Sequence, residues 1–272
     1  MDPIVIIGAG MAAYSLAREF RKLDKATPLT LVAADAGDAY AKPMLSNAFA
    51  LGKEAAQLVS GSAARMAQQL DAQVLSHTQV LSIDTARRAI HTASGTFAYS
   101  RLVLALGAHP IRLPLGGDAG GEVLSVNNLA DYAAMRARLD AIETSARVTI
   151  LGAGLIGCEF ADDLAAAGHH VTLVDPNPRP LGALAAPALS DGLAQAWAGK
   201  RITLALGTTA ESVARGAAGL QVTLADGRVI DADVVLSAVG LRPSVGLAQD
   251  AGIATRRGIV VDAYGQTSCE GV

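Results

Sequence analysis

"GAGLIGCEF", residues 152–160, is a glycine-rich turn at the start of a predicted helix, and "GAGMAAYSL", residues 8–16, repeats it near the start of the chain. Short β-branched apolar runs, "RVTILG" and "PIVIIG", precede the two turns and are typical of strands buried on both faces. After each turn, helix formers with apolar residues at helical spacing lead to a second apolar run, at 171–175 and at 29–32. The sequence therefore predicts two βαβ units.

Each position of the glycine pattern has a separate mechanical role. The first glycine permits the tight turn, the second lets backbone N–H groups approach a pyrophosphate, and the third, small residue lets the helix pack against the strand. These residues are Gly8, Gly10 and Ala13 in the first copy and Gly152, Gly154 and Gly157 in the second. Because both copies have the full strand–turn–helix–strand context, we expect two dinucleotide sites rather than close helix packing alone.

The likeness between the two halves continues after the βαβ units. Residues 94–110 and 226–243 each predict a hairpin turn, a short strand, an apolar strand and a glycine that proline follows three residues later. Segments 73–93 and 202–224 have the alternation of small antiparallel sheets inserted before the last strand of each unit. We therefore expect an α/β fold of two Rossmann-like nucleotide-binding domains with small antiparallel sheet insertions.

Composition and charge narrow the class of protein. With 272 residues, 51% hydrophobic and 17% charged, the chain has a globular composition and room for two domains. A net charge of −3 without a basic stripe gives no reason to expect a nucleic-acid partner. The first apolar run, Ile4–Ile7, is too short for a signal peptide or a membrane span, so we expect a cytoplasmic protein without membrane attachment. The two cysteines, Cys158 and Cys269, favour neither a disulfide framework nor a zinc site.

The end of the second strand decides which nucleotide each unit prefers. Asp175 stands there in the later unit, where a carboxylate would accept a hydrogen bond from a ribose 2′-hydroxyl and repel a 2′-phosphate. The later unit should therefore prefer NADH to NADPH, unless Asp175 is an exposed strand-end acid without a ligand. In the earlier unit the equivalent residue is Ala33, and Asp35, two residues further on, is the candidate for the ribose contact.

Three further motifs carry a family resemblance: "AYAKPMLSNAF" at 39–49, "LALGAHP" at 104–110 and "SAVGLRP" at 237–243. Together with the two glycine turns they resemble the FAD-dependent pyridine nucleotide oxidoreductases, most closely the rubredoxin–NAD reductases, over essentially all of the chain. The resemblance implies nucleotide-binding domains of the glutathione-reductase type. It also implies that the first unit binds FAD and the second NADH, with the nicotinamide reaching back to the flavin.

The resemblance also implies a domain organisation. The FAD-binding domain would be discontinuous, 1–112 and 241–272, around an NAD-binding domain at 113–240. In the family, the stretch that corresponds to "QTSCEGV" at 266–272 leads into a Gly-Asp motif that contacts FAD and then into a C-terminal interface domain, and this chain stops at Val272. We therefore expect either a fragment of a longer reductase or a truncated form with an incomplete FAD site and no interface domain.

The same resemblance suggests a route for electrons. Related disulfide reductases carry a cysteine pair, and related oxidases a single cysteine, after the first βαβ unit, but residues 39–49 contain none. Electrons would pass directly from the flavin to rubredoxin or a similar small iron carrier, since a flavin takes up a hydride and can release electrons singly. Three alternatives remain: the ferredoxin reductase of an oxygenase system, a nitrite-reductase-type flavoprotein, and a catalytically silent nucleotide-binding fragment.

Two candidate catalytic residues follow from the resemblance. Lys42 matches a family lysine close to the flavin ring, where a cation would stabilise the reduced anionic flavin, and Pro43 biases its backbone toward an extended conformation. Glu159 matches a family glutamate that reaches toward the nicotinamide and the flavin. A solvated loop lysine and a first-turn acid favoured by the helix dipole are the alternatives. The candidate cofactor-binding residues are Gly8, Gly10, Ala13, Asp35, Lys42, Pro43, Gly107, Gly152, Gly154, Ile156, Gly157, Glu159, Asp175 and Gly240.

Two further features have plain structural interpretations. Cys158, beside Glu159, is expected to be a small buried packing residue rather than a redox thiol, because no second cysteine lies near it in the sequence. His169 and His170 follow Gly168 at a helix end, where capping or solvation is expected rather than metal binding.

Overall fold

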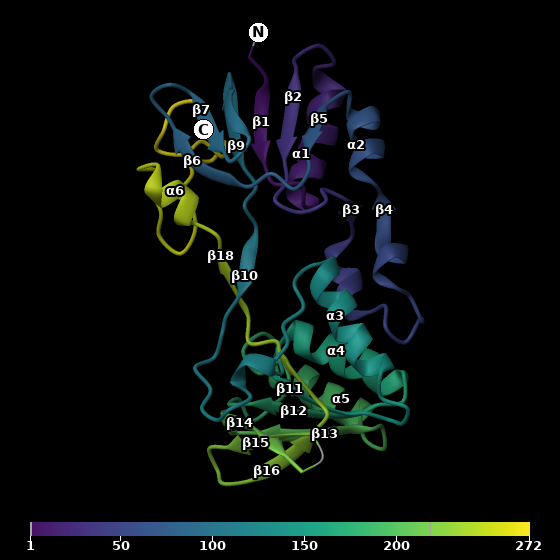
Figure 1. The fold of residues 1–272 in the computed structure, drawn as a ribbon. Coiled ribbons are helices and arrows are strands. Elements are labelled where there is room, and N and C mark those ends of the chain that lie inside the picture. The colour runs from purple at the N-terminus through teal and green to yellow at the C-terminus, as the bar shows by residue number, and fades with distance from the viewer. Residues whose placement is uncertain (1, 218) are drawn as a thin grey trace. The chain divides into compact units, whose positions relative to one another are not determined.

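The computed structural model describes residues 2–217 and 219–272. Contacts within the chain divide it into two compact units, and each unit is an α/β structure in which a glycine turn follows a central strand (Figure 1). The first unit consists of Met1–Ala41, Val59–His109 and Arg242–Val272, and the second of Lys42–Leu58 and Pro110–Leu241.

The first unit is built on a parallel four-stranded sheet in the order β5-β2-β1-β9. Its strands are β1 (Ile4–Ile7), β2 (Leu29–Val32), β5 (Gln73–Leu75) and β9 (Arg101–Leu104). β2 is buried along its whole length and β1 at all but its first residue, which is the burial that their β-branched runs predict. Ile7 at the end of β1 lies opposite both Val32 and Leu104, so the glycine turn leaves the sheet between two neighbours.

Helices and a small antiparallel sheet complete the first unit. α1 (Met11–Leu23) follows the glycine turn and buries Ala13, Tyr14 and Ala17 in a core that includes Ile6 and Leu31. The antiparallel sheet β6-β7-β8 lies in the chain between β5 and β9. The other elements are β3 (Ala39–Tyr40), β4 (Val59–Gly61), α2 (Ala63–Leu70), β6 (Val80–Asp84), β7 (Ala89–Thr92), β8 (Gly95–Ala98) and α6 (Gly246–Asp250).

The second unit repeats this plan with the parallel order β13-β12-β11-β17. Its strands are β11 (Arg147–Leu151), β12 (His170–Asp175), β13 (Ile202–Leu206) and β17 (Val234–Ser237). α4 (Leu155–Ala166) follows the glycine turn, and an antiparallel sheet precedes β17 as its counterpart precedes β9. The other elements are α3 (Leu129–Asp140), α5 (Pro187–Ala196), β14 (Ala210–Gly216), β15 (Gly219–Leu224), β16 (Val229–Ala232) and 3-10 helices at Lys42–Ser46, Ala55–Leu58 and Gly120–Glu122.

Backbone hydrogen bonds at the turns repeat between the units. The N–H of Gly8 donates to Val32 at 2.8 Å, and the N–H of Gly152 donates to Val174 at 2.7 Å. Ala33 and Asp175, the next residues along the chain, therefore occupy equivalent positions, as the sequence alignment of the two units predicts. β10 (Ala108–Pro110) pairs with β18 (Leu241–Pro243), and the boundaries of the two units fall inside these strands.

The structure corrects where the antiparallel insertions begin. The sequence placed them at 73–93 and 202–224, but the first strands of those segments, β5 and β13, belong to the parallel sheets. Both strands are only partly buried, whereas the central strands β1 and β11 are buried at all but their first residues. The antiparallel sheets themselves begin with β6 and β14.

The segment that carries Lys42 also differs from expectation. Lys42 begins a 3-10 helix instead of having the extended backbone expected before Pro43. Proline is compatible with this position because the first turn of a helix does not use its backbone N–H. The stretch Lys42–Leu58 is part of the second unit, although the sequence grouped it with the rest of 1–112.

Candidate functional site

The glycines shape each turn at the points where a side chain would not fit. A Cβ on Gly8, whose φ is +119°, would lie 2.3 Å from the carbonyl oxygen of Ala105. A Cβ on Gly157 would lie 1.9 Å from a carbonyl oxygen of its own turn, so this glycine lets α4 pack against the end of β11. Gly10 and Gly154 differ, because no heavy atom beyond the adjoining residues lies within 4 Å of the missing Cβ. That open space is what the close approach of a pyrophosphate requires.

Both helices that follow the turns begin without a side-chain cap. Gly10 precedes α1 and Gly154 precedes α4 with nearly the same extended backbone, φ/ψ of −80°/−171° and −75°/−172°. Neither helix has an acidic residue in its first turn. A helix N-terminus with its dipole and without a competing carboxylate favours an anion, so the residues of both turns fit the pyrophosphate of a dinucleotide.

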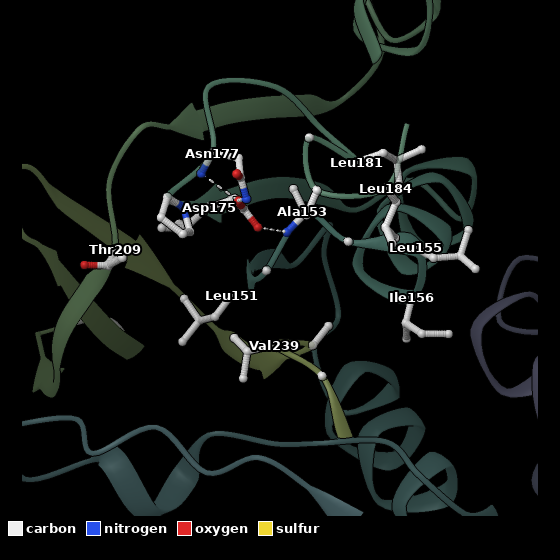
Figure 2. A pocket seen from close by; sticks show the side chains of 18 of the residues that line it. Leu151, Ala153, Leu155, Ile156, Asp175, Asn177, Leu181, Leu184, Thr209 and Val239 are labelled. Carbon is white, nitrogen blue, oxygen red and sulfur yellow. Dashed lines mark hydrogen bonds between the residues drawn. The ribbon is translucent and has the colours of Figure 1, made fainter. Parts of the chain in front are cut away.

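The turn of the second unit opens on a pocket of about 520 Å³. Figure 2 shows Asp175 and Asn177 along one wall and the side chains of Leu155 and Ile156 along another. Five of the predicted cofactor-binding residues line this pocket: Gly152, Gly154, Ile156, Asp175 and Gly240. The other lining side chains are mostly apolar, and a largely apolar pocket with a few placed polar groups is the usual form of a cofactor site.

Asp175 holds the turn as well as facing the pocket. Its Oδ2 accepts the backbone N–H of Ala153 at 2.7 Å, and its Oδ1 accepts both the backbone N–H and the Nδ2 of Asn177, each at 2.8 Å (Figure 2). A carboxylate has roughly four acceptor positions, so these three bonds leave one for a ribose hydroxyl. Its negative charge in the pocket wall opposes a phosphate at the same place.

In the first unit the position equivalent to Asp175 is Ala33, and the nearest carboxylate, Asp35, stands two residues after it. Backbone hydrogen bonds to the carbonyl oxygens of Ala33 and Asp35 repeat those to Asp175 and Asn177, so Asp35 is the counterpart of Asn177. The Asp35 side chain is exposed, and its Oδ1 accepts the N–H of Gly37 at 2.9 Å.

The strand-ending glycines have the backbone that the motif requires. Gly107 has a φ of +67° and Gly240 a φ of +114°, values that residues with a Cβ rarely adopt. The carbonyl oxygen of Gly107 accepts the N–H of Ser244, and that of Gly240 accepts the N–H of Ile111, both at 3.0 Å. Each glycine therefore lets the chain change direction three residues after its strand, β9 or β17, has ended.

A smaller pocket of the second unit, about 90 Å³, brings Lys42 and Ser46 together with Ile156. Glu159 is bonded to this wall, because its Oε2 accepts the hydroxyl of Ser46 at 2.5 Å. The Nδ2 of Asn47 approaches the same oxygen at 3.5 Å. Glu159 lies beyond the first turn of α4, so the helix dipole alone does not account for its position.

The environment of Lys42 is that of a partly buried cation. Burial lowers its pKa, and the charge of Asp131 opposes that shift. Pro43 contributes its carbonyl oxygen, which accepts the Nδ2 of Asn47 at 2.9 Å and the hydroxyl of Ser46 at 3.2 Å. Pro43 therefore closes the turn that presents Lys42, and its own ring is exposed.

Cys158 has the packing role that the sequence predicts. Its side chain is buried, and the Sγ lies 3.4 Å from the carbonyl oxygen of Ala153. Burial raises the pKa of the thiol to about 11, so it stays protonated at neutral pH. A protonated, buried thiol is a poor nucleophile.

Sequence reasoning missed Asn177, Ser46 and Asn47. Asn177 could have been found by extending the alignment of the two units, because it stands where Asp35 stands in the first. Ser46 and Asn47 lie inside the "AYAKPMLSNAF" motif, but their partner Glu159 is more than a hundred positions away, with separations of 113 and 112. A contact over that separation leaves no local pattern in the sequence.

Residues 2–217 and 219–272 contain neither a membrane-spanning helix nor a cluster of metal ligands. No helix in these ranges is long and apolar enough to cross a membrane. No group of three or more His, Cys, Asp or Glu side chains in the same ranges is arranged to hold a metal ion.

Curated relatives match the chain over almost its whole length. The rubredoxin-NAD(+) reductase of Alcanivorax borkumensis is 45% identical over 271 residues, which cover 99% of this chain and 70% of the relative. The nitric oxide reductase FlRd-NAD(+) reductase of Aeromonas salmonicida is 42% identical over 266 residues, which cover 97% of this chain and 67% of the relative. The chain thus spans about two thirds of the length of these relatives.

Solved structures share the fold. The ferredoxin reductase for the CYP199A2 system from Rhodopseudomonas palustris superposes with a TM-score of 0.90 at 29% identity, over 99% of this chain and 66% of that one. The putidaredoxin reductase in a covalent complex with putidaredoxin gives the same TM-score, identity and coverage. These likenesses confirm the predicted fold of two Rossmann-like domains with antiparallel insertions.

A family model decides the assignment. The model for the pyridine nucleotide-disulphide oxidoreductases matches residues 2–272. Proteins of this family are oxidoreductases that use FAD and NAD(H), so the predicted enzyme class and cofactors are confirmed together with the resemblance. The chain therefore belongs to the pyridine nucleotide-disulphide oxidoreductase family.

Proposed function

We propose that this chain passes electrons from NADH through FAD to rubredoxin or a similar small iron electron carrier. The observation that carries the proposal is the pair of open, uncapped glycine turns, one in each unit. One chain with two dinucleotide cradles has the means to bring a nicotinamide donor and a flavin acceptor to the same reaction.

The second unit would hold NADH. The backbone of Gly152 and Gly154 would receive the pyrophosphate, and Gly157 would keep α4 close enough to present its N-terminus. Asp175 would accept a ribose hydroxyl and disfavour the 2′-phosphate of NADPH. Ile156 and Gly240 would contact the cofactor from the pocket wall.

The first unit would hold FAD through Gly8, Gly10, Ala13, Asp35 and Gly107. When bound, FAD supplies a ring that takes up two electrons as a hydride and can release them one at a time. We assign the FAD-binding domain to 1–112 and 241–272 and the NAD-binding domain to 113–240, although Lys42–Leu58 belongs to the second compact unit.

Lys42 and Glu159 would act where the two rings react. The Lys42 ammonium, with Pro43 in the turn that presents it, would stabilise the negative charge that the flavin gains on reduction. Glu159, held by the Ser46 hydroxyl, would orient the nicotinamide. Cys158 would take no part, because it is buried and protonated.

The names of the relatives support the choice of acceptor. The matches at 45% identity are rubredoxin-NAD(+) reductases, and several at 37–42% are nitric oxide reductase FlRd-NAD(+) reductases. We place the reaction in the cytoplasm, which agrees with a chain that has two cysteines and no predicted disulfide framework.

A second candidate acceptor is a [2Fe–2S] ferredoxin. The observation that favours it is the TM-score of 0.90 with the ferredoxin reductase and with putidaredoxin reductase, each at 29% identity. The identity to the rubredoxin-NAD(+) reductases is higher, at 45%, and for that reason we rank rubredoxin first.

Coupled reduction of cytochrome c tests the proposal. The purified chain is supplied with FAD and NADH, and cytochrome c reduction is followed with added rubredoxin, with added [2Fe–2S] ferredoxin, and with neither. The proposal predicts fast reduction that depends on rubredoxin. Fast reduction with ferredoxin alone would favour the second candidate, and no reduction with either, in a chain that takes up no FAD, would identify a silent nucleotide-binding fragment.

A further inference from the structure

Two carboxylates on α4 hold the segment that carries Lys42. Glu159 and Asp163 are four residues apart, which places them on one face of the helix. Glu159 accepts the Ser46 hydroxyl, and Asp163 accepts the backbone N–H groups of Phe49 at 2.8 Å and Ala50 at 3.0 Å. All of these residues belong to the second unit.

Asp163 is the more unusual of the two acids because it is 9% exposed. A buried carboxylate is costly unless its oxygens have partners, and here each oxygen has one backbone N–H. The neighbouring Asp162 is different: its side chain is 53% exposed and bonds Lys200 and Trp197 on the outside of α4. The sequence "ADDL" thus contains one acid that holds the segment and one that does not.

Other contacts fix the same end of the segment. The Arg136 guanidinium lies over the Phe49 ring at 4.7 Å, and the His169 ring lies 5.5 Å from it. The hydroxyl of Tyr132 donates to the carbonyl oxygen of Lys53 at 2.7 Å. The residues just after the 3-10 helix Lys42–Ser46 are therefore clamped, and the only carboxylate bonded to their backbone among the described contacts is Asp163.

We propose that Asp163 is a positioning residue for hydride transfer. By holding Phe49 and Ala50 on α4, it fixes the preceding 3-10 helix so that Ser46 reaches Glu159 and Lys42 stays in the wall of the small pocket. Asp163 itself contacts no cofactor in this scheme. The inference rests on the proposed function, since it assigns Lys42 and Glu159 to the reacting rings.

The test compares Asp163→Ala with the matched control Asp162→Ala, one residue away on the same helix. In stopped flow with bound FAD, Asp163→Ala should lower the limiting rate of flavin reduction by about tenfold or more while the NADH concentration at half-saturation changes by less than about twofold. Asp162→Ala should leave both unchanged. A helix that merely unfolded would weaken NADH binding as well, because α4 also carries the pyrophosphate turn.

A second readout needs no turnover. Acylation of Lys42 at about pH 11, where most of the lysine amine is neutral whether buried or exposed, should be faster in Asp163→Ala, because the reagent reaches the partly buried lysine more easily; mass spectrometry of the full chain measures it. Asp162→Ala should label as the parent does. If Asp163→Ala does not fold, Asp163→Asn keeps one acceptor oxygen and should give smaller changes in the same directions.

Two results would overturn the proposal. Faster labelling of Lys42 with an unchanged limiting rate would make Asp163 a structural anchor only. A slower rate with unchanged labelling would mean that the effect does not pass through the Lys42 segment. Failure of the parent chain to reduce FAD with NADH is a separate outcome that refutes the proposed function instead.

Discussion

Gly154 and Gly157 stand in one turn, yet a methyl group should affect them in opposite ways. At Gly157 it would lie 1.9 Å from a carbonyl oxygen, so Gly157→Ala should destabilise the second unit by about 1–3 kcal/mol, the usual cost of overpacking. At Gly154 the methyl group would meet nothing within 4 Å, and the backbone φ of Gly154, −75°, suits any residue. Gly154→Ala should therefore leave stability unchanged and weaken NADH binding about tenfold or more, because the methyl fills the space for the pyrophosphate.

Trp197, the only tryptophan, lies in the second unit and reports its unfolding by fluorescence. Urea titration measures the stability of both glycine variants, and NADH titration measures their affinity. Loss of stability in Gly154→Ala, or normal NADH affinity in that variant, would contradict the claim that the open space at Gly154 receives the pyrophosphate.

Lys42 carries the prediction that is closest to the chemistry. Lys42→Ala should slow flavin reduction by NADH by about tenfold or more, equivalent to about 1.4 kcal/mol of lost charge stabilisation. Stopped-flow absorbance measures the rate, and Lys25→Ala, at an exposed lysine of the first unit, is the control. An unchanged rate in Lys42→Ala would make Lys42 a structural residue of its turn.

Single residues were predictable where their role is local. The structural roles of Gly157 and Asp175 follow from the turn itself, since a Cβ on Gly157 would meet Gly152 and Asp175 bonds Ala153. Asp163 was not predictable, because its partners Phe49 and Ala50 are 114 and 113 positions away. From the sequence alone, the two adjacent acids of "ADDL" both look like exposed residues on the polar face of a helix.

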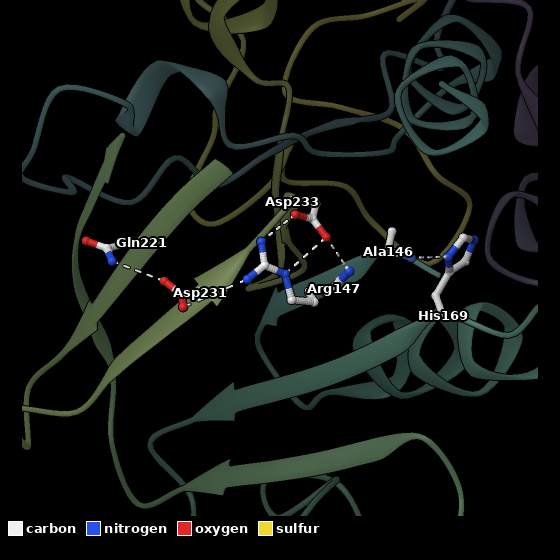
Figure 3. A network of polar contacts seen from close by, with 6 residues as sticks. All are labelled: Ala146, Arg147, His169, Gln221, Asp231 and Asp233. Carbon is white, nitrogen blue, oxygen red and sulfur yellow. Dashed lines mark hydrogen bonds and ion pairs between the residues drawn. The ribbon is translucent and has the colours of Figure 1, made fainter. Parts of the chain in front are cut away.

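At the scale of elements, strand β11 is held at its start by polar contacts on both sides (Figure 3). The backbone N–H of Arg147 donates to Asp233 Oδ2 at 2.7 Å, and its guanidinium bonds the same carboxylate, which lowers the pKa of Asp233. One residue earlier, the N–H of Ala146 donates to His169 Nδ1 at 3.1 Å. The start of the strand thus depends on a histidine that must keep one nitrogen unprotonated.

That requirement predicts a pH dependence. Burial lowers the pKa of His169 below 6.5, with Asp140 opposing the shift, so the unfolded chain binds a proton before the folded one does. The stability that neutral His169 contributes should therefore be complete above pH 6.5 and be lost as the pH falls from 6.5 toward the folded-state pKa. Over that window the free energy of unfolding of the second unit should decrease.

Urea unfolding followed at Trp197 between about pH 8 and about pH 5 measures this dependence. His169→Asn, whose amide oxygen can still accept the Ala146 N–H, should abolish the pH dependence of unfolding in this range. His170→Ala, which changes the exposed neighbour of His169, should leave the pH dependence of unfolding unchanged. The same pH dependence in parent and His169→Asn would exclude His169 as its source.

Elements were predictable from periodicity except where position in the sheet altered the pattern. The central strands β1 and β11 are buried on both faces and read as continuous apolar runs. The sequence does not separate the edge strands β5 and β13 from the antiparallel strands that follow them, because both edge strands are only partly buried. Edge and centre differ in what covers the strand, which is information that a single strand's sequence does not contain.

At the scale of the whole molecule, the duplication explains why the fold and family were predictable. Two copies of strand, turn, helix and strand give two sheets with the same strand order, and backbone hydrogen bonds at the turns repeat in both. The grouping of Lys42–Leu58 with the second unit was not predictable, because it depends on Glu159 and Asp163 of α4. Sequence order alone groups Lys42–Leu58 with the residues around it, whereas contacts within the chain group it with the second unit.

The central claim is that the chain binds FAD and accepts a hydride from NADH, and an anaerobic titration of the FAD-supplied chain tests it most directly. Visible absorbance records the oxidised flavin as NADH or NADPH is added. We predict that an equimolar amount of NADH bleaches the flavin band and that NADPH at the same concentration does so far less, because Asp175 opposes the 2′-phosphate. A chain that takes up FAD but keeps the flavin oxidised in excess NADH would contradict the claim.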